Sequence, residues 1–307
     1  MFTKAKLKVK LLSLQVLKKL KFMDLSHSKY LIETPDFRGV TNLERLVLEG
    51  CVSLRKVHSS LGDLKDLIFL NFKNCQMLKS LPSSTCDLKS LETFILSGCS
   101  KFKEFPENFG SLEMLKELYA DEIAIRVLPS SFSSLKKLKI LSFDGCKGPP
   151  STSLLWPRRI SNSILQPLSG LSSLTRLNLC DCNLSEETNL SSLGSLSLLK
   201  ELYLGGNDFV TLPSTISRLS NLELLDLQSC KRLQALPELP SSIYYIYAGN
   251  CTSLKDVSYQ VLKSLLPTGQ RQERLIMVSS LYIPYIVALI IKNKRPFNSC
   301  MFYFCNS

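Results

Sequence analysis

Apolar residues return along this chain in one spacing: apolar, two residues, apolar, one residue, apolar, two residues, then Cys or Asn. The full frame starts seven times, at Leu43, Leu67, Leu91, Leu138, Leu174, Leu199 and Leu222. Weaker copies start at Leu20, Leu115 and Ile243. Successive starts are 23, 24, 24, 24, 23, 36, 25, 23 and 21 residues apart. A period of this length indicates a repeat array, in which each repeat is one small unit of secondary structure.

Within each frame the two apolar residues around a single intervening residue predict a short strand. Alternation along a strand turns those two side chains inward and the residues around them outward. One repeat cannot bury its apolar face alone, so neighbouring copies must stack into a parallel sheet. The return segments carry Leu-Pro or Phe-Pro pairs, and proline favours extended or 3₁₀ backbone there. We therefore predict a leucine-rich-repeat horseshoe: an α/β-type solenoid with a parallel concave β-sheet and short 3₁₀ or irregular convex segments.

The Cys or Asn that closes each frame is expected to turn inward and satisfy backbone groups of the adjoining loops. Asn can do this with two donors and an acceptor, whereas Cys offers a weak S–H donor and a compact apolar body. Seven of the eleven cysteines occupy this slot: Cys51, Cys75, Cys99, Cys146, Cys182, Cys230 and Cys251. We interpret them as core residues with free thiols.

The frame divides the chain into three parts. Residues 1–19 form a basic N-terminal segment or a degenerate cap repeat. Residues 20–267 form the repeat domain, with an insertion at 147–170 that explains the one interval of 36 residues. Residues 268–307 form a divergent apolar and basic tail. Within the tail, residues 275–291 are apolar but slightly short for a membrane span; an anchor remains the alternative to a non-homologous tail.

The outward strand positions are the candidate recognition surface. Their columns mix acidic residues with Tyr, Phe, Ile and Arg, the side chains that dominate binding energy at protein interfaces; the alternative is that some only pack on each other. Acidic residues outnumber basic ones there, which argues against nucleic acid even though the chain carries a formal charge of +12. The partner-binding candidates, including two from the insertion, are Arg45, Phe69, Ile95, Glu117, Tyr119, Asp144, Trp156, Arg158, Arg176, Glu201, Tyr203, Asp226, Tyr245 and Tyr247. Val47, Asn71, Ser142 and Asn178 share the central outward column.

The sequence offers little for catalysis. Its two histidines, His27 and His58, lie in separate repeat turns without a nucleophile and base around them. No phosphate-binding G-x-x-x-x-G-K-[ST] loop and no C-x-x-C pair occurs. We therefore expect no enzyme, cofactor or metal, and protein rather than small-molecule or membrane partners. No signal-peptide pattern opens the sequence, so the expected location is the cytoplasm, with the nucleus as a second compartment.

Two stretches resemble a known family more closely than generic repeats do. Residues 21–51 read KFMDLSHSKYLIETPDFRGVTNLERLVLEGC, and residues 236–254 read LPELPSSIYYIYAGNCTSL. With the Cys-type frame, they are similar to the repeat region of plant TIR-NBS-LRR disease-resistance receptors, over about residues 14–267. The resemblance implies recognition of pathogen effectors and restraint of a nucleotide-binding module, with enzymatic and nucleotide-switch activities in domains outside these repeats. After Gly269 the sequence departs from the family pattern, so a truncated product or gene-model fragment is expected.

The sequence also allows other functions. The chain could be a truncated decoy or scaffold that binds the parent receptor's own nucleotide-binding domain, using the same surface. A cell-surface leucine-rich-repeat ectodomain would need a signal peptide, paired cap cysteines and a G-x-I-P turn. An enzyme or regulatory subunit would need a nucleophile–base set.

Overall fold

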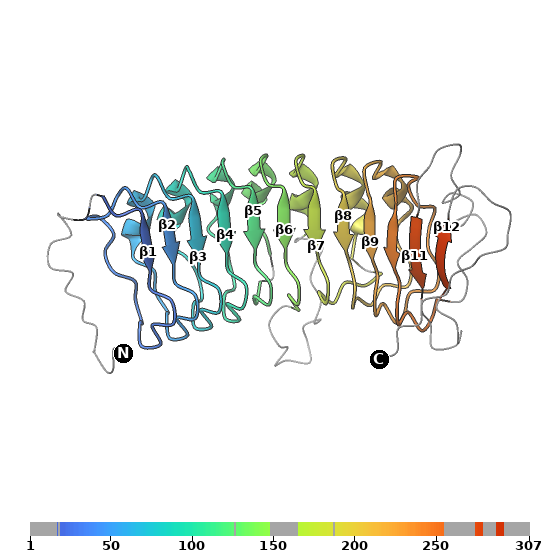
Figure 1. Cartoon of the computed structure of the whole chain (residues 1–307), viewed down its shortest axis with the longest axis horizontal. Helices are drawn as coiled ribbons and strands as arrows, with labels where there is room; N and C mark the ends of the chain where they lie inside the picture. Colours follow the sequence, from blue (N-terminus) through green and yellow to red (C-terminus); the bar gives the residue numbers. More distant parts are fainter. Residues whose placement is uncertain are drawn as a thin grey trace.

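In the computed structural model the repeats stack side by side as one long array of parallel strands (Figure 1). The structure describes residue 17 and residues 19–125, 127–147, 165–186, 188–254, 274–278 and 287–291. Each of the ten frames forms one three-residue strand. These are β1 (Phe22–Asp24), β2 (Arg45–Val47), β3 (Phe69–Asn71), β4 (Thr93–Ile95), β5 (Glu117–Tyr119), β6 (Ile140–Ser142), β7 (Arg176–Asn178), β8 (Glu201–Tyr203), β9 (Leu224–Asp226) and β10 (Tyr245–Tyr247).

The strands pair in parallel and in chain order, and the frame predicts their register to the residue. Arg45 of β2 faces Phe22 of β1 and Phe69 of β3, and the same column continues through every strand to Tyr245 of β10. The leucine-rich-repeat fold predicted from the spacing is therefore confirmed. Because every outward position repeats at the same place in the frame, this pairing turns sequence periodicity into columns of neighbouring side chains.

The sheet continues past β10 into the residues assigned above to the divergent tail. Strand β11 (Arg274–Val278) pairs in parallel with β10, and β12 (Val287–Ile291) pairs with β11 in the antiparallel direction. All of β12, and all of β11 except Arg274, fall within residues 275–291, the apolar stretch considered as a possible anchor. A search of the described residues finds no helix that is long and apolar enough to span a membrane.

On the other side of the core, short 3₁₀ helices replace the α-helices that thicker repeats carry. They are η2 (Ser59–Asp63), η3 (Ser83–Asp87), η4 (Phe109–Ser111), η5 (Ser130–Ser134), η6 (Gln166–Gly170), η7 (Leu190–Ser195) and η8 (Ser214–Arg218). Pro82, Pro129 and Pro213 stand at the N-caps of η3, η5 and η8 with φ of −64°, −62° and −68°. Proline's fixed φ suits this position, and a cap needs no N–H donor.

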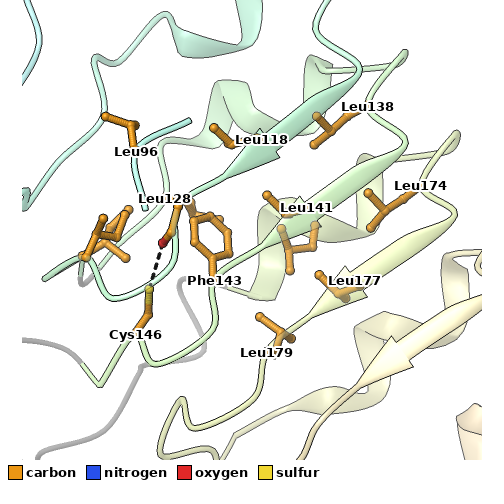
Figure 2. Packing of buried hydrophobic residues seen from close by; sticks show 14 of the residues in the cluster. Leu96, Leu118, Leu128, Leu138, Leu141, Phe143, Cys146, Leu174, Leu177 and Leu179 are labelled. Atoms are coloured by element: carbon orange, nitrogen blue, oxygen red, sulfur yellow. Dashed lines mark hydrogen bonds between the residues drawn. The ribbon is translucent and has the colours of Figure 1, made fainter. Parts of the chain in front are cut away.

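The core lies between these two layers and consists of rows of stacked side chains. Leu118, Leu141 and Leu177 come from consecutive strands and are fully buried (Figure 2). In the middle repeats the 3₁₀ helices and the segments before them contribute an aromatic row: the ring centre of Phe109 lies 4.6 Å from that of Phe105 and 5.5 Å from that of Phe132. Each residue contacts its counterparts one repeat away, so the stability of a repeat depends on its neighbours.

The closing slot of each frame behaves as the sequence predicts. Every slot cysteine is buried, and each thiol donates to a carbonyl one repeat earlier, as Cys146 does to Ala120 at 3.2 Å (dashed line in Figure 2). Asn207 fills the slot of one repeat and forms more hydrogen bonds than a slot cysteine does. Its side-chain amide donates to the carbonyls of Leu179 and Leu204 at 2.8 and 2.7 Å, and its oxygen accepts from the N–H groups of Cys182 and Leu184 at 3.0 Å each.

The residue just before each slot shows a regularity that the spacing alone does not predict. This residue adopts positive φ in all ten repeats. Glycine alternates with other residue types over the first nine of them, and the last two are Ser229 and Asn250. The side chains of His27, Asn74, Glu122 and Asp181 each lie against the glycine of the next repeat. A Cβ on Gly98 would stand 2.1 Å from Oδ1 of Asn74, and one on Gly50 would stand 2.4 Å from Nδ1 of His27. Positive φ and this close approach both favour glycine at these turns.

Candidate functional site

The concave face of β1–β10 brings the predicted strand residues together in columns. The first column contains Arg45, Phe69, Glu117, Arg176, Glu201 and Tyr245; the second contains Ile95, Tyr119, Tyr203, Asp226 and Tyr247. Asp144 stands two residues after the second column, beyond the end of β6. Trp156 and Arg158, from the insertion, lie outside the described residues. We call this two-column face, with the residues that follow each strand, the concave surface.

The concave surface is less exposed than the alternation suggests. Arg45, Arg176 and Tyr245 are exposed, whereas the other described candidates are half-buried. The expectation that the whole second column is exposed is wrong at Asn71 and Ser142, which are only 6% and 8% exposed. Both are short polar side chains held down by neighbours: Asn71 bonds Glu49 and the N–H of Lys73, and the Ser142 hydroxyl donates to Asp121.

At the N-terminal end of the concave surface, an arginine lies over an aromatic ring. The guanidinium carbon of Arg45 is 4.1 Å from the centre of the Phe69 ring, and Phe22, its neighbour on the other side, is 50% exposed. Stacking of this kind stabilises the cation and restricts the side chain.

The middle of the concave surface is acidic and hollowed. A hollow of about 640 Å³ lies at the carboxyl ends of the strands, lined among others by Lys73, Asp121, Asp144, Lys147 and Asp181. Asp121 accepts hydrogen bonds from the hydroxyls of Ser97 and Ser142 and from the N–H of Asp144. Burial, together with the nearby Asp121 carboxylate, raises the pKa of Asp144.

A network of three side chains joins β7 to β8. Arg176 donates two hydrogen bonds to Glu201, at 2.6 and 2.9 Å, and the Tyr203 hydroxyl donates to the same carboxylate at 2.8 Å. The Arg176 hydrogen bonds lower the pKa of Glu201, and burial together with the Glu201 carboxylate raises the pKa of Tyr203 to about 12. Two N–H donors of Arg176, one on Nε and one on a terminal nitrogen, are therefore already engaged by the next repeat.

The two histidines lie in separate turns, and Nδ1 of His58 is 2.8 Å from Oγ of Ser60. Nδ1 of His58 accepts from the N–H of Ser60 and caps η2, and His27 occupies one of the left-handed turns. Among the described residues, no group of three or more His, Cys, Asp or Glu side chains could hold a metal ion.

The hollow is the part of the surface that sequence reasoning missed. Asn74, Glu122 and Asp181 line it from the turn position before the closing slot, and Lys147 lines it from just after a slot. The place of each of these residues within the repeat frame could be assigned from the sequence. Their approach to one another depends on the left-handed backbone, which the spacing does not show.

Searches for relatives agree with this architecture. No family model matches the chain. The chain is 32% identical to TMV resistance protein N of Nicotiana glutinosa over 80% of its own length and 27% of that protein's. It is 33% identical to disease resistance protein RPS4B of Arabidopsis thaliana over 78% of its length and 18% of that protein's. It therefore spans only about a quarter or less of these relatives.

Solved structures similar to the chain share its fold. The leucine-rich-repeat domain of the type III effector XCV3220 (XopL) superposes with a TM-score of 0.58 and 24% identity, over 72% of this chain and 75% of that one. The Leptospira interrogans protein LIC12759 gives 0.51 and 22%, over 80% and 73%. At this level of identity the likeness concerns the fold alone.

Proposed function

Because this chain belongs to the family of plant TIR-NBS-LRR disease-resistance proteins, as a leucine-rich-repeat region, we propose that it recognises proteins in defence signalling. In this proposal the concave surface senses a pathogen effector in the cytoplasm. In the absence of effector, the same repeats restrain the activation of the receptor.

The observation that supports this proposal best is the concave surface itself. Its anchors are Tyr and Arg side chains, the types most enriched among residues that dominate protein interfaces. They stand on a hydrogen-bonded sheet whose register leaves little freedom to the backbone, so binding costs little ordering of the chain. The role needs no chemistry from the repeats: the chain would act by binding.

A pull-down from plant cytosol tests the proposal. Tagged wild-type chain is compared with a variant that combines Tyr203→Ala, Tyr245→Ala and Tyr247→Ala. The matched control combines Tyr30→Ala and Val127→Ala on the return segments, whose side chains are 85% and 52% exposed. Circular dichroism must first show that all three proteins are folded.

We expect a partner that the control retains and the triple variant loses. If that partner occurs only in extracts from infected tissue, it identifies effector sensing. If it is the nucleotide-binding part of a resistance protein, restraint or the decoy role is supported instead. Capture of the same partner by the triple variant would place recognition elsewhere and refute the proposed surface.

A further inference from the structure

Two arginines on the concave surface are in different states. Arg176 is paired with Glu201 of the next repeat through two hydrogen bonds. The guanidinium of Arg45 instead lies against the Phe69 ring, and among the described residues it makes neither an ion pair nor a side-chain hydrogen bond. Five N–H donors on a planar, always charged group are thus held in place and left available.

The carboxylates around Arg45 are already engaged with other groups. Glu44 pairs with Lys21 at 2.9 Å, Glu49 accepts from the Asn71 amide at 3.2 Å, and Asp24 accepts from the Ser26 N–H at 2.8 Å. None of them neutralises the guanidinium. The flanking Phe22 and Phe69 rings add apolar surface in the same column, with Phe22 half exposed.

From this arrangement we infer that the Phe22–Arg45–Phe69 column docks a segment of a partner protein that presents a carboxylate beside an apolar side chain. The inference rests on the proposed recognition function and specifies the chemistry of the partner. A planar carboxylate matches the guanidinium fork with two parallel hydrogen bonds. The neighbouring apolar side chain covers the exposed aromatic rings.

A nucleic-acid backbone fits this column poorly. Neutralising phosphates requires several clustered cations. Here Lys21, which accepts the N–H of Arg45 at its carbonyl, is already paired with Glu44, and Asp24 stands in the second column beside Arg45. One carboxylate next to one hydrophobic group matches the single unpaired guanidinium of this column, whereas a chain of phosphates would leave most of its charges without a cation.

The test uses the full chain, labelled with ¹⁵N, and the Nε–Hε resonances of its arginines. The probe is N-acetyl-L-phenylalanine, a carboxylate beside an aromatic ring, and its matched control is N-acetyl-L-phenylalaninamide. Backbone amides of Val47 and Leu70 report binding in variants that lack the Arg45 resonance. The variants are Arg45→Gln, Arg45→Lys and, as the matched control, Arg176→Gln.

We expect the acid to shift the Arg45 resonance saturably, with an affinity about tenfold higher than that of the amide, the ratio for a hydrogen bond to a charged group. Arg45→Gln should remove that preference, and Arg45→Lys should reduce it, since lysine keeps the charge without the fork. Arg176→Gln should leave it unchanged. Equal binding of acid and amide, a preference that survives in Arg45→Gln, or no saturable shift would overturn the inference.

The pull-down separates this inference from the proposed function. A partner that is lost in the tyrosine variant but binds Arg45→Gln as it binds wild type would support recognition by the concave surface and refute the Arg45 column. A carboxylate preference at Arg45 with no partner lost in the tyrosine variant would support the column and refute the broader proposal.

Discussion

Replacing Asn207 by cysteine should destabilise the protein, even though cysteine fills the same slot in seven other repeats. The slot cysteines each donate one weak S–H bond to a carbonyl, as Cys230 does to Leu204 at 3.4 Å. Asn207, only 1% exposed, also accepts from the N–H groups of Cys182 and Leu184. A thiol can replace the donor but is a poor acceptor for two N–H groups at once.

The magnitude follows from those two donors. Each buried N–H that loses its acceptor costs about 1–3 kcal/mol, and the thiol recovers part of the lost bond to a carbonyl. We therefore expect Asn207→Cys to lose about 2–4 kcal/mol of unfolding free energy. In an array of this size, each kcal/mol corresponds to roughly 2–4 °C in Tm if unfolding is cooperative.

Urea denaturation followed by circular dichroism measures the loss, and hydrogen exchange locates it. Exchange should accelerate first at the amides of Cys182 and Leu184. Cys230→Ala is the control, since it deletes one thiol bond and should cost about 1 kcal/mol. The reasoning would be refuted if Asn207→Cys were as stable as wild type, or if Asn207→Ala were much less stable than Asn207→Cys.

Three further predictions concern the turns, the core and the acidic hollow. Gly98→Ala should lower Tm by an amount equivalent to at least about 1 kcal/mol, because φ is 78° and the new Cβ would meet Asn74. In contrast, Ser229→Gly should raise Tm, because Ser229 has a φ of 61° that glycine adopts more readily. Phe109→Ala should cost about 3–5 kcal/mol in urea titrations, as it empties the centre of the aromatic row; a loss below that of Cys230→Ala would contradict the packing. Asp144 has a raised pKa, so the native state binds its proton more tightly and stability falls as pH rises from 3.8 through the raised value. Asp144→Asn should therefore raise Tm at neutral pH and change it little below pH 3.8; an equal effect at both would show that ionisation is not the cause.

Much of the architecture could be predicted because the information is local and repeated. The spacing that starts at Leu43 defines the inward pair of β2, the outward positions beside that pair and the slot at Cys51. The same assignment follows independently from the next repeat. Repetition removes the usual uncertainty in strand register, since a shift by one residue would expose every leucine. The Pro82 type of return likewise indicated 3₁₀ backbone from one residue's φ.

The candidate surface was predicted less completely than the fold. Its columns were correct, but which side chains remain available depends on contacts between repeats. Asn71 and Ser142 are held by residues that follow the strands of their own and the preceding repeats. The two concave arginines differ because only one of them has a glutamate partner in the next repeat.

By itself, then, the sequence of this protein determined the repeat, the strand register, the inward ladder and the slot chemistry, because each depends on spacing within about 24 residues. Only the tertiary structure decided the left-handed turns before the closing slots, the hollow between them, the pairing of Arg176 with Glu201 and the position of Arg45 over Phe69. Those features arise between side chains more than 20 residues apart, and they depend on which rotamer each chooses against its neighbour. A periodic pattern specifies which positions are neighbours in the sheet, whereas packing decides which contacts their side chains make.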